Sequence, residues 1–190
     1  PYIFIYFCHF FIKIAIYIVK EEKEMIIDKR LIHYNFSPRY GTKIAYIVIH
    51  DTANKAPGAN ALNHYRYFAG GNRKASAHYF VDDKGIVQII EDNMSAWHCG
   101  DGQGRYGITN SNSLGIEMCI NEGSDFKKVM ERTADLAVCL AKFYNLKPDK
   151  IVRHYDASRK ICPSSLCKNN WQGWWIFKEV IKSKYEKIKM

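Results

Sequence analysis

The sequence predicts a single α/β domain, and three features indicate this fold class. The chain has 190 residues, a length that fits one domain with a sizeable core. Residues 44–49 are apolar at every position, as expected of a central strand whose two faces are both covered. Over 125–144, apolar residues recur at helical spacing. Strands and helices therefore alternate along one chain, without internal repeats or a clear linker.

The other elements follow from local patterns in chain order. A short helix is expected over 59–68, because Gly70 and Gly71 follow it as a stop signal. The turn at 82–85 separates two short apolar runs, which predicts a hairpin. The Gly-, Asn- and Ser-rich stretch over 101–113 is expected to be a loop over the site. The remaining expected elements are strands over 77–81, 86–90, 114–120 and 151–153, and a final helix over 171–187.

Three potential metal ligands stand far apart in the sequence. His50 ends the apolar run, His154 follows the short strand at 151–153, and Cys162 comes eight residues later. Two imidazoles and a thiolate supply three of the four positions of a tetrahedral zinc site, and an open fourth position is typical of catalytic zinc. For each residue taken alone, an ordinary, half-buried position is the favoured interpretation, and only the surrounding sequence reverses this preference.

The sequences around these residues form five ordered motifs. They are Ile47–Asn54, Ala75–Asp82, Trp97–Asp101, Ser113–Cys119 and Arg153–Pro163. In this order and spacing the chain resembles the zinc-dependent N-acetylmuramoyl-L-alanine amidases, which include phage endolysins, bacterial autolysins and peptidoglycan recognition proteins. The resemblance spans about residues 28–183, and the Ser-Ala-His-Tyr version of the second motif is similar to Gram-positive prophage endolysins.

The resemblance implies a fold, a cofactor and a reaction. The expected fold is a central mixed β-sheet flanked by α-helices, and the expected ligands of Zn²⁺ are His50, His154 and Cys162. The implied reaction is hydrolysis, by a zinc-activated water, of the amide between the lactyl group of N-acetylmuramic acid and L-alanine in peptidoglycan. The alternative is a non-catalytic peptidoglycan-binding receptor on the same fold. Binding-only members commonly lose the zinc cysteine, which this chain retains.

Glu117 is the candidate general base. Strand alternation over 114–120 places it on the face opposite Leu114, Ile116 and Met118. A buried carboxylate needs a partner, so a salt bridge to Lys or Arg is the structural alternative. The resemblance favours the catalytic role, because this branch of the family carries a glutamate in the matching Gly-Ile-Glu motif.

Lys160 and three aromatic side chains complete the candidate site. Lys160 lies two residues before Cys162, as in the Lys-x-Cys-Pro motif of the family that the chain resembles. The resemblance implies that its ammonium stabilises an oxyanion and favours the thiolate; a solvated lysine is the alternative. His78 and His98 are candidates for orienting substrate, or they are structural histidines. Trp97 either stacks on a sugar or packs in the core. The catalytic tyrosine of the phage lysozyme-like branch is not transferred, because Ala77 occupies its position.

The six cysteines do not form a disulfide framework, and a chain of this size does not need one. Cys162 and Cys167 are close enough in sequence to pair. That bridge would remove the metal thiolate, and we expect both cysteines to be free.

The net charge of +9 indicates a polyanionic partner. Nucleic acid is one candidate, and teichoic acids and the acidic peptides of a bacterial wall are another. The motifs favour the wall, and the chain has no phosphate loop, zinc knuckle or basic recognition helix that would favour nucleic acid. We therefore expect bacterial peptidoglycan as the partner, no nucleic acid, and action at the cell wall. The charge pattern does not indicate an oligomeric state.

Residues 1–24 are a separate question. Residues 2–19 are almost entirely apolar, but Lys13 interrupts them at a cost of about 2.5–3.5 kcal/mol in a bilayer. They also lack the positive start and small-residue end of a signal peptide. Because the codons for 20–25 resemble a ribosome-binding site before a start codon, we expect residues 1–24 to be non-native upstream translation or a hydrophobic leader. Residues 25–190 would then form the catalytic domain, made in the cytoplasm, with no stable membrane partner.

Overall fold

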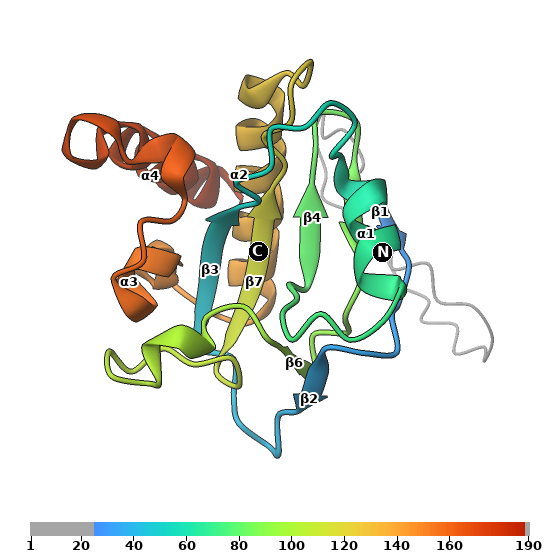
Figure 1. Ribbon diagram of the computed structural model, residues 1–190. Coiled ribbons are helices and arrows are strands. Elements are labelled where there is room, and N and C mark those ends of the chain that lie inside the picture. The colour runs from blue at the N-terminus through green and yellow to red at the C-terminus, as the bar shows by residue number, and fades with distance from the viewer. Residues whose placement is uncertain (1–24, 189–190) are drawn as a thin grey trace, which may run out of the picture.

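A six-stranded mixed sheet forms the centre of the computed structural model, which describes residues 25–188 (Figure 1). The expectation for residues 1–24 falls outside this range. In spatial order the strands are β1 (Ile27–Lys29), β5 (Ile86–Gln88), β4 (Tyr79–Val81), β7 (Ser113–Met118), β3 (Tyr46–Asp51) and β8 (Ile151–Arg153). Neighbouring strands are parallel, except that β4 and β5 form the expected antiparallel hairpin. The sheet is therefore mixed, as the family resemblance implied.

Helices cover both faces of this sheet. They are α1 (Ala61–Ala69), α2 (Phe126–Phe143), α3 (His154–Ser158) and α4 (Lys168–Lys187), with single 3₁₀ turns η1 (Gly100–Gly102), η2 (Pro148–Lys150) and η3 (Ser164–Leu166). The first core cluster joins α2 and α4 to one face, whereas α1 packs on the other face over β4 and β5 (Figure 1). On that second face α3 packs over β3 and β8. The face between α1 and α3 is where the sheet presents its polar side chains.

The alternation of strand residues assigns the two faces. Leu114, Ile116 and Met118 of β7 are fully buried in the cluster with α2 and α4. Glu117 points to the opposite face, and it stands beside His50 in the parallel register of β3 and β7. The expected orientation of the strand over 114–120 is confirmed.

Helix caps explain where α1 and α2 begin. The side chain of Asn60 accepts a hydrogen bond from the backbone of Asn63, and Asp125 does the same for Lys128. These bonds satisfy backbone N–H groups that a first helical turn leaves unpaired. The C-terminal helix starts at Lys168, before the expected 171, but residues 169–171 have left-handed backbone angles. Regular helix therefore begins only after them.

Besides the 3₁₀ turns, four short elements had no counterpart in the sequence predictions. They are the helix α3, the strand β1, and the strands β2 (Phe36–Pro38) and β6 (Met94–Ala96), the last two of which pair in a small antiparallel sheet. Over residues 25–188, no helix is both long enough and apolar enough to cross a membrane.

Candidate metal centre

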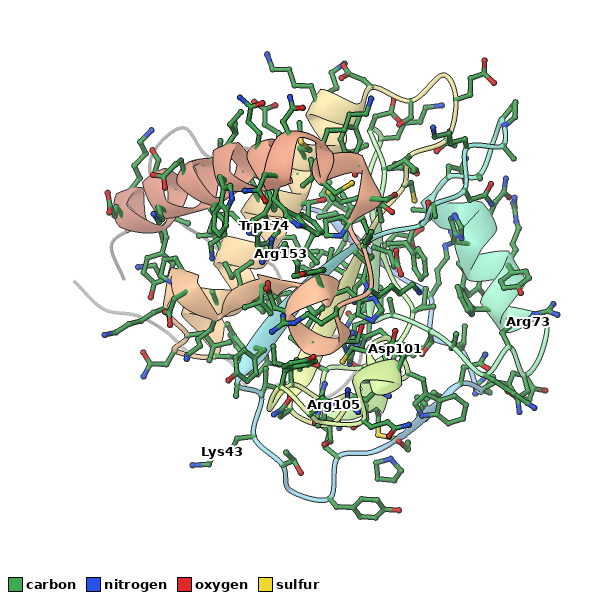
Figure 2. The ribbon with its side chains drawn as sticks, turned by 60° about the vertical axis from the view of Figure 1, so that its left-hand side comes forward. Lys43, Arg73, Asp101, Arg105, Arg153 and Trp174 are labelled. Carbon is green, nitrogen blue, oxygen red and sulfur yellow. The ribbon has the colours of Figure 1, made fainter. Side chains whose placement is uncertain are left out.

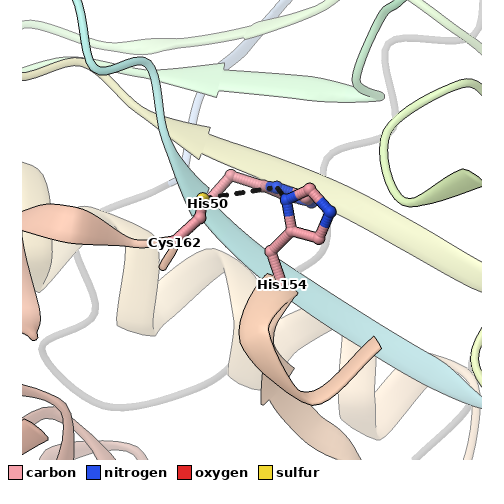
Figure 3. Close-up of side chains that lie close together, drawn as sticks. All are labelled: His50, His154 and Cys162. Atoms are coloured by element: carbon pink, nitrogen blue, oxygen red, sulfur yellow. Dashed lines mark hydrogen bonds between the residues drawn. The ribbon is translucent and has the colours of Figure 1, made fainter. Parts of the chain in front are cut away.

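The three expected ligands converge at one point (Figure 3). His50 comes from β3, His154 is the first residue of α3, and Cys162 lies in the loop before η3. The Nδ1 atoms of His50 and His154 are 3.1 Å apart, and the Cys162 Sγ is 3.7 Å from the Nδ1 of His50. All three ligand atoms lie within 4.8 Å of one another. All three side chains are buried.

These separations fit a tetrahedral ion. With metal–nitrogen bonds of about 2.0–2.1 Å and a metal–sulfur bond of about 2.3 Å, tetrahedral angles put two nitrogens about 3.4 Å apart and nitrogen and sulfur about 3.6 Å apart. The observed 3.1 and 3.7 Å are close to both values. The side chains therefore need little rearrangement to hold a metal ion.

Local packing fixes His154 at the start of α3. The preceding residue, Arg153, donates to the carboxylate of Asp156 at 2.6 Å, and Asp156 accepts the Arg153 backbone N–H at 2.9 Å. The Arg153 guanidinium lies 4.4 Å from the Trp171 ring centre and 5.8 Å from that of Trp174. Figure 2 shows Arg153 and Trp174 near each other. Stacking on aromatic faces is a favoured environment for arginine. The metal histidine is thus anchored to the C-terminal helix.

The outer nitrogen of His154 shows how this ligand is protonated. Its Nε2 lies 2.8 Å from the Oδ1 of Asp101, a carboxylate that can only accept. Nε2 therefore carries the proton, and the lone pair of Nδ1 is directed at the cluster. Burial lowers the pKa of His154, and burial also lowers the pKa of His50 well below its usual value. Both imidazoles are held in the neutral form that binds metals.

Cys162 is the ligand that most needs a cation. Burial raises the pKa of its thiol, and the nearby Glu117 raises it further, whereas the Lys160 ammonium lowers it. Lys160 acts in the expected direction, but the effect of burial is larger. A positive ion between the three ligands would reverse this balance, since a coordinating thiol is deprotonated.

Glu117 faces the same side of the sheet as His50. Burial, and then the charge of Asp51, raise the pKa of Glu117 to about 8, although Lys160 acts in the other direction. Its Oε2 is buried without a hydrogen-bond partner, and no ion pair in the described part of the chain includes it. The salt bridge considered from the sequence is therefore absent between residues 25 and 188.

A polar cleft opens beside the cluster. Its lining is Lys74, Trp97, His98, Gly100, Asp101, Asn110, His154 and Lys160. Lys160 is exposed at this cleft, and its ammonium makes no hydrogen bond or ion pair to any other described residue. The indole of Trp97 is anchored by a 3.3 Å hydrogen bond to the Ser37 hydroxyl. Two of the expected substrate-binding residues, Trp97 and His98, thus line the cleft.

His78 lies behind the site instead. It is 0% exposed, its Nδ1 accepts the Gly115 backbone N–H at 2.9 Å, and its Nε2 faces the carbonyl of Met94 at 3.1 Å. A side chain without exposed surface cannot contact a substrate, so the structure places His78 among the structural histidines. Tyr79 points to the other face of the sheet, where its hydroxyl donates to Asp92 at 2.7 Å.

The burial of His78 leads to a prediction about acid stability. Burial, and then Arg39, lower its pKa to about 3, against about 6.5 in an unfolded chain. Below pH 6.5 the unfolded chain binds a proton that the folded chain does not, so this histidine makes the free energy of unfolding fall as pH decreases. The slope is about 1.4 kcal/mol per pH unit. Urea unfolding is measured from pH 7 to 5 with chelator present throughout. The free energy of unfolding should fall less steeply with decreasing pH in His78→Asn than in the wild type, and the difference should approach the uptake of one proton on unfolding.

The matched control for this experiment is His33→Asn, at an exposed histidine. It should retain the wild-type slope. Equal slopes for His78→Asn and the wild type would contradict the assignment of His78 as a neutral, buried histidine.

Sequence reasoning missed two functional positions in this region. Asp101 holds His154, and the Asn110 side chain accepts the backbone N–H groups of His98 and Cys99 at 3.0 and 2.8 Å. Asp101 ends the third motif, which was a usable signal, whereas Asn110 is one polar residue in a polar loop.

The five cysteines of the described range, including Cys162 and Cys167, are free, as expected.

Comparisons with known proteins agree with this site. Residues 40–165 match the family described as N-acetylmuramoyl-L-alanine amidase. The chain is 41% identical over 152 residues to the N-acetylmuramoyl-L-alanine amidase CwlL of Bacillus licheniformis, covering 73% of this chain and 42% of that protein. It is 37% identical over 136 residues to CwlH of Bacillus subtilis (strain 168), covering 72% and 53%. The chain thus spans about half or less of the length of these curated relatives.

Solved structures are similar over most of the chain. The catalytic domain of XlyA superposes with a TM-score of 0.74 at 36% identity, covering 83% of this chain and 99% of that one. The structure of PlyL gives a TM-score of 0.69 at 32% identity, covering 83% and 98%. The shared region therefore has the mixed sheet and flanking helices described above.

Proposed function

The chain belongs to the N-acetylmuramoyl-L-alanine amidase family, and we propose that it hydrolyses the amide between the lactyl group of N-acetylmuramic acid and L-alanine in peptidoglycan. The observation that carries this proposal is the convergence of His50, His154 and Cys162 on one point beside a polar cleft. The similarity to the catalytic domain of XlyA supports it. In this proposal residues 25–190 are the catalytic domain, and its place of action is the bacterial cell wall.

Zn²⁺ is the ion we propose for the cluster. Two imidazoles and one thiolate are a nitrogen–sulfur donor set that suits zinc, and the separations of the ligand atoms fit its bond lengths. When bound, zinc supplies Lewis-acid chemistry that polarises a carbonyl and makes water a nucleophile at neutral pH. One thiolate and two neutral imidazoles leave the occupied site with a net positive charge.

The protein's own side chains would handle the proton and the negative charge. Glu117 takes the proton of the attacking water and gives it to the leaving amine. Its pKa is raised to about 8 in the metal-free protein, and a bound cation would lower this value towards neutral pH, where one group can serve as both base and acid. Lys160 reaches the developing oxyanion from the rim of the cleft, where its ammonium is free of other described partners. Trp97 presents its anchored indole as a wall for a sugar ring.

Two observations favour catalysis over a receptor that only binds peptidoglycan. The chain retains the thiol of Cys162 together with both histidines. It also keeps the buried oxygen of Glu117 without a partner. A buried polar oxygen without a hydrogen-bond partner costs free energy, and a role in catalysis accounts for that cost, whereas binding alone does not. Neither observation involves nucleic acid, which we do not propose as a partner.

Product analysis tests the reaction. Purified sacculi digested by the protein should gain free L-alanine amino groups, with no gain in reducing sugars. Full removal of metal with a chelator should stop the release, and added Zn²⁺ should restore it. New reducing ends would identify a glycosidase instead, and release that persists without metal would reject the metal mechanism. Binding to sacculi without any release by the zinc-loaded protein would establish the receptor.

A further inference from the structure

We propose that the segment Trp97–Gly102 is an outer brace of the metal centre, in which His98 and Asp101 hold both metal histidines in the tautomer that binds the ion. These two side chains contact the outer nitrogens of His50 and His154. They are three residues apart in one segment, although their partners are 104 residues apart. The inference rests on the proposed function only for the identity of the ion.

The tautomer of His50 follows from a chain of hydrogen bonds. The carbonyl of Thr109 can only accept, so the Ser113 hydroxyl donates its proton there. The Ser113 oxygen then accepts from the Nε2 of His98, at 3.2 Å. A neutral imidazole has one N–H, so the Nδ1 of His98 is an acceptor, and it lies 3.0 Å from the Nε2 of His50. His50 must therefore carry its proton on Nε2 and direct the lone pair of Nδ1 at the cluster.

Asp101 does for His154 what His98 does for His50. Its carboxylate accepts the proton of the His154 Nε2, as described above, and leaves Nδ1 free. Figure 2 shows Asp101 on η1, next to α3. Partners of this kind orient metal ligands, and their loss typically weakens metal binding 10–100-fold. One segment thus sets the orientation of two ligands that come from different elements.

Fixed contacts hold this segment in place without a metal. The Asn110 side chain accepts the backbone N–H groups of His98 and Cys99. The Trp97 backbone exchanges hydrogen bonds with Ser76: its carbonyl accepts the Ser76 N–H at 2.9 Å, and its N–H donates to the Ser76 hydroxyl at 2.8 Å. The acceptors for both histidines are therefore preorganised, which lowers the cost of ordering the ligands.

Two glycines allow the brace to lie close to β7 and to α3. A Cβ at Gly115 would lie 2.7 Å from the Cγ of His98, so the imidazole packs directly on the β7 backbone. A Cβ at Gly102 would lie 2.1 Å from the carbonyl oxygen of Ala157, so η1 packs directly on α3. Any other residue at either position would push the brace away from the histidine that it holds.

Zinc affinity measures this role directly. Competition with a chelator of known affinity should show zinc binding 10–100-fold weaker in His98→Ala and in Asp101→Ala. His98→Asn and Asp101→Asn should recover part of the loss, because an amide oxygen can accept at the position of the lost atom. The matched control is His64→Ala, since His64 stacks on Phe80 and its Nε2 is buried without a hydrogen-bond partner. That variant should bind zinc like the wild type.

Two further readouts separate positioning from general damage. Thermal unfolding of the metal-free proteins should be similar for His98→Asn and the wild type. The visible spectrum of the Co²⁺-loaded protein should shift in His98→Ala, because the orientation of His50 at the metal changes. Unchanged zinc affinity in both alanine variants would overturn the brace. If the alanine variants do not fold, zinc affinity is measured in His98→Asn, Asp101→Asn and Gly115→Ala instead. Gly115→Ala must bind zinc more weakly than the wild type. Wild-type zinc affinity in all three of these variants also overturns the brace.

The outcome for the brace is distinguishable from that for the amidase reaction. A wild-type protein that binds zinc tightly but releases no L-alanine refutes the reaction and leaves the brace intact. If the wild-type protein hydrolyses sacculi and the brace variants bind zinc with unchanged affinity, the brace alone is refuted. A wild-type protein that binds no zinc refutes both.

Discussion

Cys162→Ser should release the metal and abolish hydrolysis. The Cys162 Sγ is the only sulfur in the cluster, 3.7 Å from the Nδ1 of His50. A serine hydroxyl is a neutral, hard oxygen donor, so the site loses its one anionic ligand and its preference for zinc. Because loss of an outer partner already costs 10–100-fold, we expect loss of this ligand to weaken zinc binding by at least about 100-fold. Zinc content after dialysis and L-alanine release from sacculi measure both effects.

Cys167→Ser is the control for this variant. Cys167 is a free, half-buried cysteine five residues further along, outside the cluster. It should retain zinc and activity. Cys162→Ser should also keep the fold, because the change is nearly isosteric, and circular dichroism checks this. A Cys162→Ser protein with full zinc content and normal turnover would contradict the assignment of the metal centre.

The sequence predicted the long elements well because their periodicity depends on burial alone. The helices over 59–68 and 125–144 appear with errors of one or two residues at their ends. The orientation of Glu117 followed from strand alternation, since a side chain must point to the face opposite its neighbours. The candidate metal ligands were recognised through motifs, because no local pattern states that residues 104 positions apart will meet.

Tertiary contacts account for what the sequence did not reveal. The strands β2 and β6 have three residues each, and such short runs carry no measurable period. The brace depends on the tautomer of His98, which is set by Ser113 and Thr109 from another part of the chain. The same applies to His78, whose complete burial depends on how the sheet packs. These features follow from spatial neighbours, which the order of residues does not give.

Glu117→Gln should keep the metal and lose most of the rate. The amide has the shape of the carboxyl group but cannot take a proton, so the water loses its base and the leaving amine loses its acid. General acid–base groups contribute about 10²–10⁴-fold, and we expect kcat to fall within that range while KM changes little. Zinc affinity should stay close to that of the wild type, because Glu117 is outside the ligand set. Initial rates of L-alanine release, measured on zinc-loaded protein, give both kinetic constants.

The fold should tolerate this substitution well. The pKa of Glu117 is raised to about 8, so at pH 7 the metal-free protein already holds this side chain protonated, and glutamine resembles that form. Thermal unfolding of metal-free Glu117→Gln at pH 7 should therefore match the wild type. Glu122→Gln, at an exposed glutamate just after β7, should leave rate, zinc affinity and stability unchanged. A full rate in Glu117→Gln would assign the base to another residue, and lost zinc would make Glu117 a ligand rather than a base.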